Sequence, residues 1–411
     1  MKDRRMIGQL FAVIIFDYLC LFSEAYTIND ELSLHTAIFN STYDRDVRPG
    51  ASRSTPLQIM VTFIFKSIKE LDESVGKFSI TGALGVFWVD HRLSWNPTDY
   101  GGDLNTTVVP QKKIWIPFLV NTMDFDTLKP IGHNELNLRV ANDGKVTWIT
   151  PNMFESTCDA DMSFYPFDSQ ICTLRFYIQG FTLSEIVFAI PKSSMDMNEY
   201  SENGIWEVKE TQIYIAINSQ QIQEVRMTIS MKRRPVYYIS SLILPVIFLA
   251  FLQLFVFVMP PECGERVGFV TTVLLAIAVY LTLVQDKLPE GSEPSVSFLS
   301  YKLLGDFMIG VFMTISVIVG LRFYHREEET VIPDYLETFH RMLFRCCRCK
   351  RKHKVNFDEK KSATEVTIDS VSKILTWRDI GMAIDRFCLI LFGIILVISN
   401  GVYLAVMCFY T

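Results

Sequence analysis

The sequence predicts an α+β membrane protein built from two parts, an extracellular all-β sandwich followed by a four-helix transmembrane bundle. Three observations support this fold class: an apolar leader at the N-terminus, a first half with many short alternating segments, and a second half with four apolar runs long enough to cross a bilayer. We therefore divide the chain into a signal peptide at 1–25, a sandwich at 26–235 and a membrane part at 236–411.

The N-terminal segment MKDRRMIGQLFAVIIFDYLCLFSEA has the pattern of a secretory signal peptide. A basic start precedes an apolar middle, and Ser23 and Ala25 are small residues spaced for cleavage before Tyr26. A transmembrane anchor is the alternative, but Asp17 and Glu24 leave the apolar run short for a bilayer span. The segment therefore predicts export of the chain that follows it.

Residues 56–235 have the pattern of β-strands. Apolar and polar residues alternate in LQIMVTFIF, KVTWI, IYIAI and VRMTISM, which is the period of a strand with one buried face. Turn signals such as NDG at 142–144 and ENG at 202–204 separate these segments. Many short strands at this spacing predict an all-β sandwich.

The second half contains four apolar runs that predict transmembrane helices. We place these helices at about 237–258, 267–288, 298–323 and 386–409, with an intracellular loop at 324–385. The loop carries the basic stretch HRMLFRCCRCKRKHK, and lysine and arginine close to a membrane favour the cytoplasmic side. With an exported N-terminus, four spans place both termini outside, so we expect a multi-pass protein of the plasma membrane.

Two of the nine cysteines, Cys158 and Cys172, lie in the polar first half, whereas the others lie in the leader or near the apolar runs. Only this pair would face an oxidising exterior, so we expect a disulfide between them. Closing a loop of this size stabilises a fold by roughly 3 kcal/mol in the chain-entropy model. Pro166, between two aromatic residues, is a candidate for a cis bond, and the sequons at Asn40 and Asn105 are candidate glycosylation sites.

The stretch from Cys158 to Cys172 resembles the signature loop of the Cys-loop receptors, the pentameric ligand-gated ion channels, with thirteen residues between the cysteines and an aromatic-Pro-Phe-Asp core. Further motifs resemble this family in the expected order: WVDHRLSWNP at 88–97, WIP at 115–117, GKVTW at 144–148, ENGIW at 202–206, and RRPVYY from 233 through Pro245. The resemblance covers residues 56–411. It implies a pentamer, of identical chains or with related subunits, in which the closed loop presses on the membrane part.

The second apolar run carries a stripe of residues at helical spacing. Alternating steps of three and four residues pick out Glu265, Gly268, Thr272, Leu275, Val279 and, one heptad further, Asp286. Repeated around a cyclic assembly, each position becomes a ring; acidic rings at both mouths would concentrate cations, and the rings of Leu275 and Val279 would gate by dewetting. The stripe alone fits a buried bundle helix with capping acids at least as well, but the order of the family motifs favours a pore.

Cation selectivity is predicted from Gly264-Glu265-Arg266, which is similar to the pattern of the cation-selective, nicotinic acetylcholine receptor-like channel subunits. Anion-selective relatives carry a Pro-Ala pair there and lack the acidic residue. The resemblance therefore implies permeation of monovalent cations, sodium and potassium. Gly268 stands where relatives commonly carry a small hydroxyl residue, so calcium permeability is left open.

The expected ligand site departs from the nicotinic pattern, in which an aromatic cage holds a quaternary ammonium. Gln179 stands where the family has its cage tryptophan, Ala83 replaces the tryptophan of the complementary face, and the hairpin at 210–224 has no adjacent cysteine pair. By alignment, a pocket between subunits would be lined by Tyr177, Gln179, Phe181 and Tyr214 and, across the interface, by Ala83, Arg139, Thr147 and Ile149. This set suits a carboxylate or zwitterion better than acetylcholine, and the small-molecule agonist stays unidentified.

The resemblance also implies a path that couples ligand binding to the pore. It would run from the disulfide loop and the end of the sandwich to the linker after the second helix, through Pro166, Phe167, Asp168, Arg233, Arg234 and Pro289. Agonist binding and pore opening would then both shift the equilibrium between two conformations of the same structural element.

Two alternatives to a self-sufficient channel stay open: a non-conducting or modulatory subunit that requires a partner, and a channel gated by protons or a non-cholinergic ligand. An enzyme is not expected, because the sequence lacks a P-loop, a dinucleotide fingerprint, a nucleophile elbow and an HExxH motif. We likewise expect no cofactor and no nucleic-acid partner. A transporter would more often show inverted repeats and a broken helix at the midplane.

The basic loop contains Cys346, Cys347 and Cys349, which are candidates for palmitoylation beside a membrane, although unmodified thiols are the simpler interpretation. A zinc site with His340 or His353 matches no common ligand spacing, so we predict no metal site. The family resemblance also leaves a postsynaptic location open.

Overall fold

The computed structural model describes residues 26–410 except for 41, 51, 53–54, 133–134, 287–295, 328–329, 331 and 347–374. The predicted signal peptide, Pro289, Cys347 and Cys349 lie outside the described residues. Two compact units are present: one contains the described residues up to Ala160 together with Ser169–Arg233, and the other contains Asp161–Asp168 and the described residues from Arg234 onward. The predicted fold class is confirmed, because β-sheets are followed by four apolar helices.

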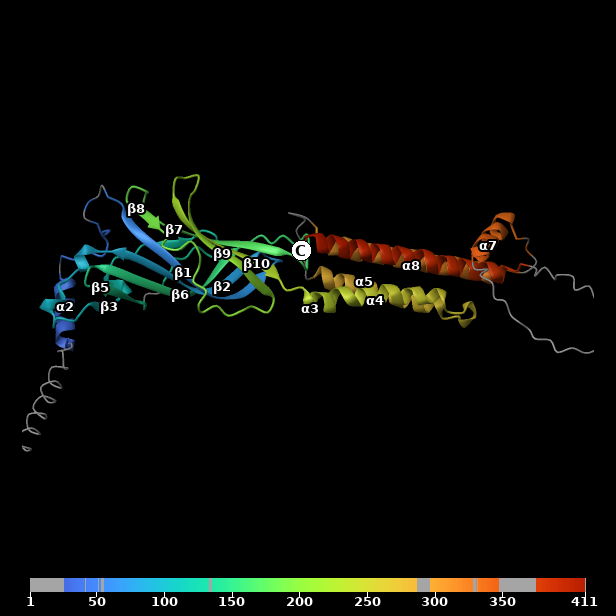
Figure 1. Cartoon of the computed structure of the whole chain (residues 1–411), viewed down its shortest axis with the longest axis horizontal. Coiled ribbons are helices and arrows are strands. Elements are labelled where there is room, and N and C mark those ends of the chain that lie inside the picture. Colours follow the sequence, from blue (N-terminus) through green and yellow to red (C-terminus); the bar gives the residue numbers. More distant parts are fainter. Residues whose placement is uncertain are drawn as a thin grey trace, which may run out of the picture. The chain divides into compact units, whose positions relative to one another are not determined.

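The first unit is a sandwich of two sheets (Figure 1). The six-stranded sheet has the order β3 (Thr106–Pro110), β5 (Asn137–Ala141), β6 (Lys145–Thr157), β2 (Lys77–Val89), β1 (Leu57–Asp72) and β8 (Ile186–Ala189). The four-stranded sheet has the order β4 (Leu119–Asn121), β7 (Ser169–Ile178), β10 (Gln223–Arg233) and β9 (Trp206–Ile217). A short helix, α2 (Ile28–Ile38), precedes the strands, and its first turn is closed by a capping box between Thr27 and Asp30.

Alternating apolar residues fill the space between the two sheets. In β7 every second side chain is buried, as the period of a strand with one core face requires. Aromatic rings pack in this core: the ring centre of Phe154 on β6 lies 5.3 Å from that of Phe63 on β1 in the same sheet and 5.8 Å from that of Phe176 on β7 in the other sheet, both edge to face. Trp88 and Trp148 are also fully buried in this core.

The predicted disulfide is confirmed. Cys158, directly after β6, is bonded to Cys172 in β7, with an S–S distance of 1.98 Å. Because β6 and β7 belong to different sheets, this bond ties the two sheets together at one end of the sandwich. The predicted cis peptide bond between Tyr165 and Pro166 is present as well.

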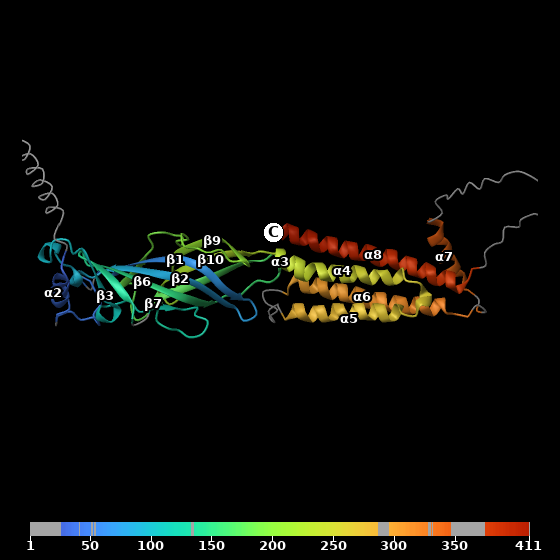
Figure 2. The same ribbon diagram turned by 90° about the horizontal axis from the view of Figure 1, so that it is seen from below.

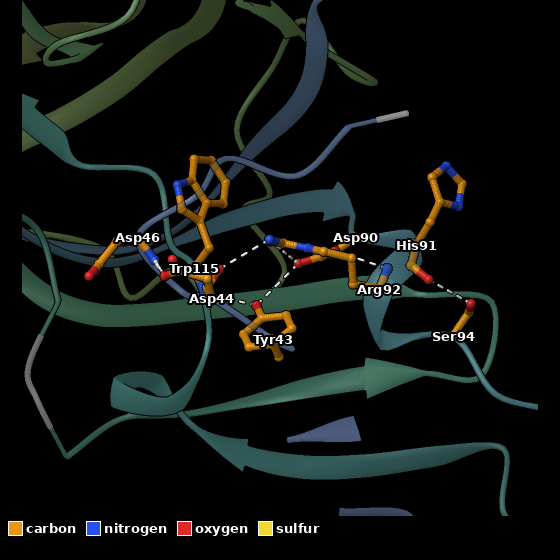
Figure 3. Close-up of polar contacts among 8 residues, drawn as sticks. All are labelled: Tyr43, Asp44, Asp46, Asp90, His91, Arg92, Ser94 and Trp115. Atoms are coloured by element: carbon orange, nitrogen blue, oxygen red, sulfur yellow. Dashed lines mark hydrogen bonds and ion pairs between the residues drawn. The ribbon is translucent and has the colours of Figure 1, made fainter. Parts of the chain in front are cut away.

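A buried carboxylate organises the segment before β1 (Figure 3). Asp90 is 1% exposed, and its two oxygens accept from Nε and Nη2 of Arg92, both at 2.8 Å. The Tyr43 hydroxyl donates to Asp90 Oδ2 at 3.1 Å and accepts from the Trp115 backbone N–H at 3.1 Å. Burial raises the pKa of Tyr43 to about 12, so the phenol keeps its proton and acts as the donor. Arg92 Nη1 also donates to the Asp44 carbonyl oxygen, which fixes this segment to the end of β2.

The second unit contains four helices that run side by side (Figure 2). The first span, Val236–Phe257, is divided into α3 (Val236–Tyr238), a π-helical turn (Ile239–Ile243), α4 (Leu244–Leu254) and a 3-10 turn (Phe255–Phe257). The others are α5 (Arg266–Gln285), α6 (Phe298–Tyr324) and α8 (Trp377–Tyr410), and α7 (Asp334–Cys346) lies between α6 and α8 in sequence. All four spans are long and apolar enough to cross a membrane.

Pro245 explains the irregular turn in the first span. Proline has no backbone N–H, so the carbonyl of Ser241, four residues earlier, loses its ordinary helical partner. The hydroxyl of Tyr280 on α5 donates to this carbonyl instead. A freed backbone group inside a membrane is costly unless a neighbouring helix satisfies it, and here α5 does so.

The fourth helix corrects the predicted boundaries. It begins at Trp377 rather than at 386, so the predicted intracellular loop at 324–385 contains α7 and the first nine residues of α8. A capping box starts the helix: the Thr376 backbone N–H donates to Asp379 Oδ2 at 3.1 Å, and the Asp379 backbone N–H donates to Thr376 Oγ1 at 3.4 Å. The first nine residues of α8 include charged side chains and so do not form an apolar run, which is why the sequence did not indicate that they belong to the helix.

We expect Asp90→Asn to destabilise the sandwich by roughly 1.5–3 kcal/mol, because the variant loses charge-assisted hydrogen bonds inside a buried cluster. Thermal unfolding of the full-length protein in detergent measures the effect. Asp46→Asn is the matched control, since Asp46 is in the same segment but its side chain is 87% exposed and 3.7 Å from Arg45. Equal falls in Tm for the two variants would contradict the role given to Asp90.

Candidate functional site

The stripe predicted to line a pore lies on the exposed side of α5. Leu275 and Val279 are 64% and 52% exposed, and the acidic residues Glu265 and Asp286 cap the two ends of the helix. Gly268 and Thr272 are exposed as well, whereas the buried residues of the helix are Arg266, Val270, Val273, Ile277 and Val284. One subunit therefore leaves uncovered a helix face that is apolar in the middle and polar at both ends.

The basic residue beside Glu265 is neutralised inside the bundle. Arg266 is 1% exposed, and its Nη2 and Nη1 lie 2.9 Å and 3.0 Å from the two carboxylate oxygens of Asp385 on α8. Its Nε donates to the Val256 carbonyl oxygen at 3.1 Å. The charge of Arg266 is balanced by Asp385 and therefore does not neutralise its neighbour Glu265. Glu265 is exposed and contributes an unbalanced negative charge at this end of α5. Asp385 was not among the predicted site residues, although an acidic residue at the edge of an apolar run is a signal of a functional position.

The hydroxyl of Thr272 is oriented by its own helix. Thr272 Oγ1 donates to the Gly268 carbonyl oxygen at 2.7 Å, which uses its only proton. The oxygen therefore presents acceptor lone pairs at the exposed face. Acceptor groups at this position suit a cation better than an anion.

The outer face of the four-stranded sheet brings two predicted ligand residues to a charged cluster. Tyr177 is paired with Glu224 across β7 and β10, and Tyr214 is paired with Arg226 across β9 and β10. Arg226 Nη2 donates to Glu224 Oε2 at 3.1 Å, and Glu224 is 6% exposed. Arg175 stands directly opposite Arg226, and its Nε is buried with no hydrogen-bond partner in the described part of the chain.

This face therefore carries two guanidinium groups and one carboxylate between its two tyrosines. The tyrosines were predicted as site residues, whereas Arg175, Glu224 and Arg226 were not. Their signal was the period of two in TLRFYIQ and EVRMTIS, which places these charges on the same face as the tyrosines once the strands are paired.

A cleft of about 560 Å³ lies at the end of the sandwich where β7 ends and where the chain turns from β9 into β10. Tyr177 and Phe181 line it, together with the turn after β7 and the hairpin tip Gln220–Gln223. Gln179 and Tyr214 are exposed but are not among the lining residues. The hairpin itself was expected near the ligand site, but its tip residues were not among the predicted lining residues, because only the fold brings them against the turn after β7.

The residues predicted for the complementary side share one face of the six-stranded sheet. Thr147 and Ile149 alternate along β6, Arg139 is paired with Thr147 from β5, and Ala83 lies on the neighbouring strand β2. Ile149 is 44% exposed, whereas Ala83 is 3% exposed. This set and the Tyr177 set belong to different sheets of the chain, so a pocket that uses both requires two subunits.

The apex of the disulfide loop, Asp161–Asp168, groups with the helical unit and contains three of the predicted coupling residues. The Phe298 N–H at the start of α6 donates to the Ser163 carbonyl oxygen at 2.9 Å. The ring of Tyr165 lies 5.3 Å from that of Tyr238 in the first span. The apex is thus attached to two of the four spans.

The two predicted coupling arginines differ in their surroundings. Arg233 is 3% exposed, its Nη2 lies 2.6 Å from Glu73 Oε1, and its guanidinium lies 4.3 Å from the ring centre of Trp206. Arg234 is exposed and begins the helical unit. The sandwich therefore holds Arg233 at the end of β10, one residue before the chain enters the other unit.

Both candidate glycosylation sites are at the surface. Asn40 and Asn105 are exposed, and the Thr42 hydroxyl of the first sequon donates to Asn40 Oδ1 at 2.5 Å. Their exposure leaves room for a glycan, and the modification itself stays a prediction.

Comparison with known proteins gives the family of this chain. Residues 31–235 match the neurotransmitter-gated ion-channel ligand binding domain, and residues 242–373 match the neurotransmitter-gated ion-channel transmembrane region. The chain is 29% identical over 350 residues to the neuronal acetylcholine receptor subunit alpha-6 of Mus musculus, which covers 82% of this chain and 68% of the relative. It is 30% identical over 332 residues to the alpha-6 subunit of Rattus norvegicus, with 77% and 64% covered.

A third relative is the acetylcholine receptor subunit delta of Mus musculus, to which the chain is 27% identical over 363 residues, with 82% of this chain and 68% of the relative covered. The chain thus spans about two thirds of the length of these relatives. Both family models match in the order in which the sandwich and the helices occur. With its disulfide-closed loop and four spans, the chain belongs to the neurotransmitter-gated ion-channel family, as a Cys-loop receptor subunit of the nicotinic acetylcholine receptor type.

Proposed function

We propose that this chain is a subunit of a pentameric, ligand-gated, cation-selective channel. An extracellular small molecule bound between subunits opens a pore lined by α5, through which sodium and potassium pass. The pentamer is formed by this chain alone or with related subunits. Residues 1–25 are a signal peptide, residues 26–235 the extracellular domain and residues 236–411 the membrane domain.

The observation that carries this proposal is the charge arrangement at the start of α5. Arg266 is buried against Asp385, and Glu265 is exposed beside it. In a cyclic assembly with α5 facing the axis, only the carboxylates form a charged ring, which concentrates cations at the mouth. Leu275 and Val279 then form the narrow apolar section, and their exposure in one subunit fits this role.

The proposed orientation puts the sandwich and both termini outside the plasma membrane and the segment 324–385 inside. Support comes from the basic loop, which favours the cytoplasm, and from the four spans, which return the chain to the side from which it entered. A postsynaptic location is also part of this proposal, and its only support is the similarity to neuronal acetylcholine receptor subunits.

A second candidate is a subunit that conducts only with a partner. It is favoured by the composition of the predicted pocket, in which Gln179 and the buried Ala83 take the places of two tryptophans. Voltage clamp of cells that express this chain alone separates the two candidates. Evoked current supports a homomer, whereas silence with confirmed surface expression supports the subunit that needs a partner.

We expect Glu265→Gln to lower single-channel cation conductance by at least about twofold, because a mouth lined by one sign of charge raises the local counter-ion concentration by roughly 10-fold or more. Reversal potentials under sodium and chloride substitution measure the accompanying loss of selectivity. Glu262→Gln is the control: Glu262 lies three residues away, and it accepts a hydrogen bond from Tyr324 at 2.9 Å. An unchanged conductance in Glu265→Gln would exclude this ring as the selectivity element.

We expect Leu275→Ser to raise the basal current, since a hydroxyl in the narrow apolar section lets water enter and eases opening. The basal current is measured by voltage clamp at equal surface expression. Ile315→Ser on α6 is the control, because Ile315 is 51% exposed but lies on a different helix. Unchanged or reduced opening in Leu275→Ser alone would count against Leu275 as the gate.

We expect the agonist to carry a carboxylate, because the face between Tyr177 and Tyr214 has two guanidinium groups and one carboxylate. Arg175→Gln should weaken the apparent affinity for such an agonist by about 10-fold or more, the effect of losing one charge-assisted hydrogen bond. Dose–response curves for amino acids, choline esters and protons measure this. Lys209→Gln is the control, since Lys209 on β9 is paired with Glu207 at 2.6 Å. A choline-type agonist of micromolar potency that is insensitive to Arg175→Gln would contradict this choice of ligand.

A further inference from the structure

The helix α6 contains an ion pair inside its membrane-spanning segment. The Lys302 ammonium contacts Asp306 Oδ2, one helical turn away, and the side chains are 8% and 0% exposed. Ionisable groups at such a position are costly and mark functional sites in membrane proteins. A buried pair is also stable only when the remaining lone pairs of the carboxylate find donors.

That condition is not met by the surrounding side chains. Asp306 Oδ1, Asn400 Oδ1 and the Tyr403 hydroxyl are all buried and have no hydrogen-bond partner among the residues that the structure describes. The residues are 1%, 8% and 2% exposed. Asn400 Nδ2 donates to the Leu396 carbonyl oxygen at 2.8 Å, which leaves the amide oxygen as the unsatisfied atom.

All three residues line one small cavity. It has a volume of about 10 Å³ and lies among the first span, α6 and α8. Its other lining residues are Lys302 and the apolar Ile243, Val246, Ile247, Leu299 and Leu303. A cavity of roughly 10–15 Å³ accommodates one water molecule when polar partners are present. An organic ligand is larger than a water molecule and would not fit in this volume.

We propose that this cavity is a binding site for a single water molecule that bridges α6 and α8 within one subunit. The water donates to Asp306 Oδ1 and to Asn400 Oδ1 and accepts from the Tyr403 hydroxyl. This arrangement uses both protons of the water and supplies every unsatisfied atom with a partner. Tyr403 is held in place by its ring, which stacks on Phe298 at 6.1 Å.

A metal cation is a poorer occupant of the site. Lys302 already balances the charge of Asp306, so a second positive charge would be left without a counter-ion in the bundle. The cavity is also too small for an ion with its hydration shell. The bound water therefore completes the hydrogen bonds of the Asp306 carboxylate and fixes the position of α8 relative to α6.

The test is a double-mutant cycle on the full-length protein in lipid nanodiscs, read as the apparent Tm. Tyr403→Phe removes only the donor and should lower the Tm by about 2–4 °C, the usual effect of one hydrogen bond in a domain of this size. In the background Lys302→Met with Asp306→Leu, the carboxylate that accepts from the water is gone and only Asn400 is left as its second partner, so Tyr403→Phe should lower the Tm by clearly less.

Tyr324→Phe is the matched control, because Tyr324 is also on a span but its hydroxyl donates a hydrogen bond directly to Glu262 Oε1 at 2.9 Å. Its effect should be the same in both backgrounds. An equal fall for Tyr403→Phe in both backgrounds would overturn the proposal. If the double variant does not assemble, a high-resolution map of the wild-type protein decides: density for one water in contact with Asp306, Asn400 and Tyr403 supports the site, and continuous apolar packing there or density for an ion overturns it.

Discussion

The ion pair between Arg266 and Asp385 is the constraint on which the helical unit depends. It joins the first residue of α5 to the early part of α8, and Arg266 also donates to the backbone where the first span ends. Three spans therefore meet at one buried guanidinium. Because a buried charge cannot lose its partner without a large cost, this contact fixes the rotation of α5 about its axis. The rotation in turn decides that Glu265, Leu275 and Val279 are on the exposed side.

The other polar contacts in the helical unit follow the same rule. The Ser241 carbonyl, freed by Pro245, is satisfied by Tyr280, and Gln253 Nε2 donates to the Gly310 carbonyl oxygen at 3.1 Å. Each contact joins a different pair of helices. Apolar side chains do not distinguish a neighbouring helix from lipid, so polar contacts and close packing specify the arrangement of the bundle. Among the described residues of the helical unit, the buried side-chain atoms without a hydrogen-bond partner are those of Asp306, Asn400 and Tyr403.

The sandwich is held together differently, by the alternation of apolar and polar residues along its strands, by one disulfide and by one buried hydrogen-bond cluster. Its core is apolar on both inner faces, and the disulfide between Cys158 and Cys172 joins the sheets at one end. The cluster around Asp90 fixes the segment before the first strand. With the scaffold held in this way, the outer faces are free to carry charge, and the four-stranded sheet carries Arg175, Glu224 and Arg226 beside two tyrosines.

The sequence by itself determined the fold class, the disulfide and the four apolar spans, because each depends on a local pattern or on residue type. It marked Pro166 only as a candidate for a cis bond, which the structure then showed. It also identified the stripe on α5, since helical period alone sets which side chains share a face. Tertiary structure decided what those patterns leave open. Asp385 was missed because its value as a partner for Arg266 depends on two helices more than a hundred residues apart, and strand pairing alone placed Arg175 opposite Arg226. Partners distant in sequence follow from packing, which no local pattern encodes.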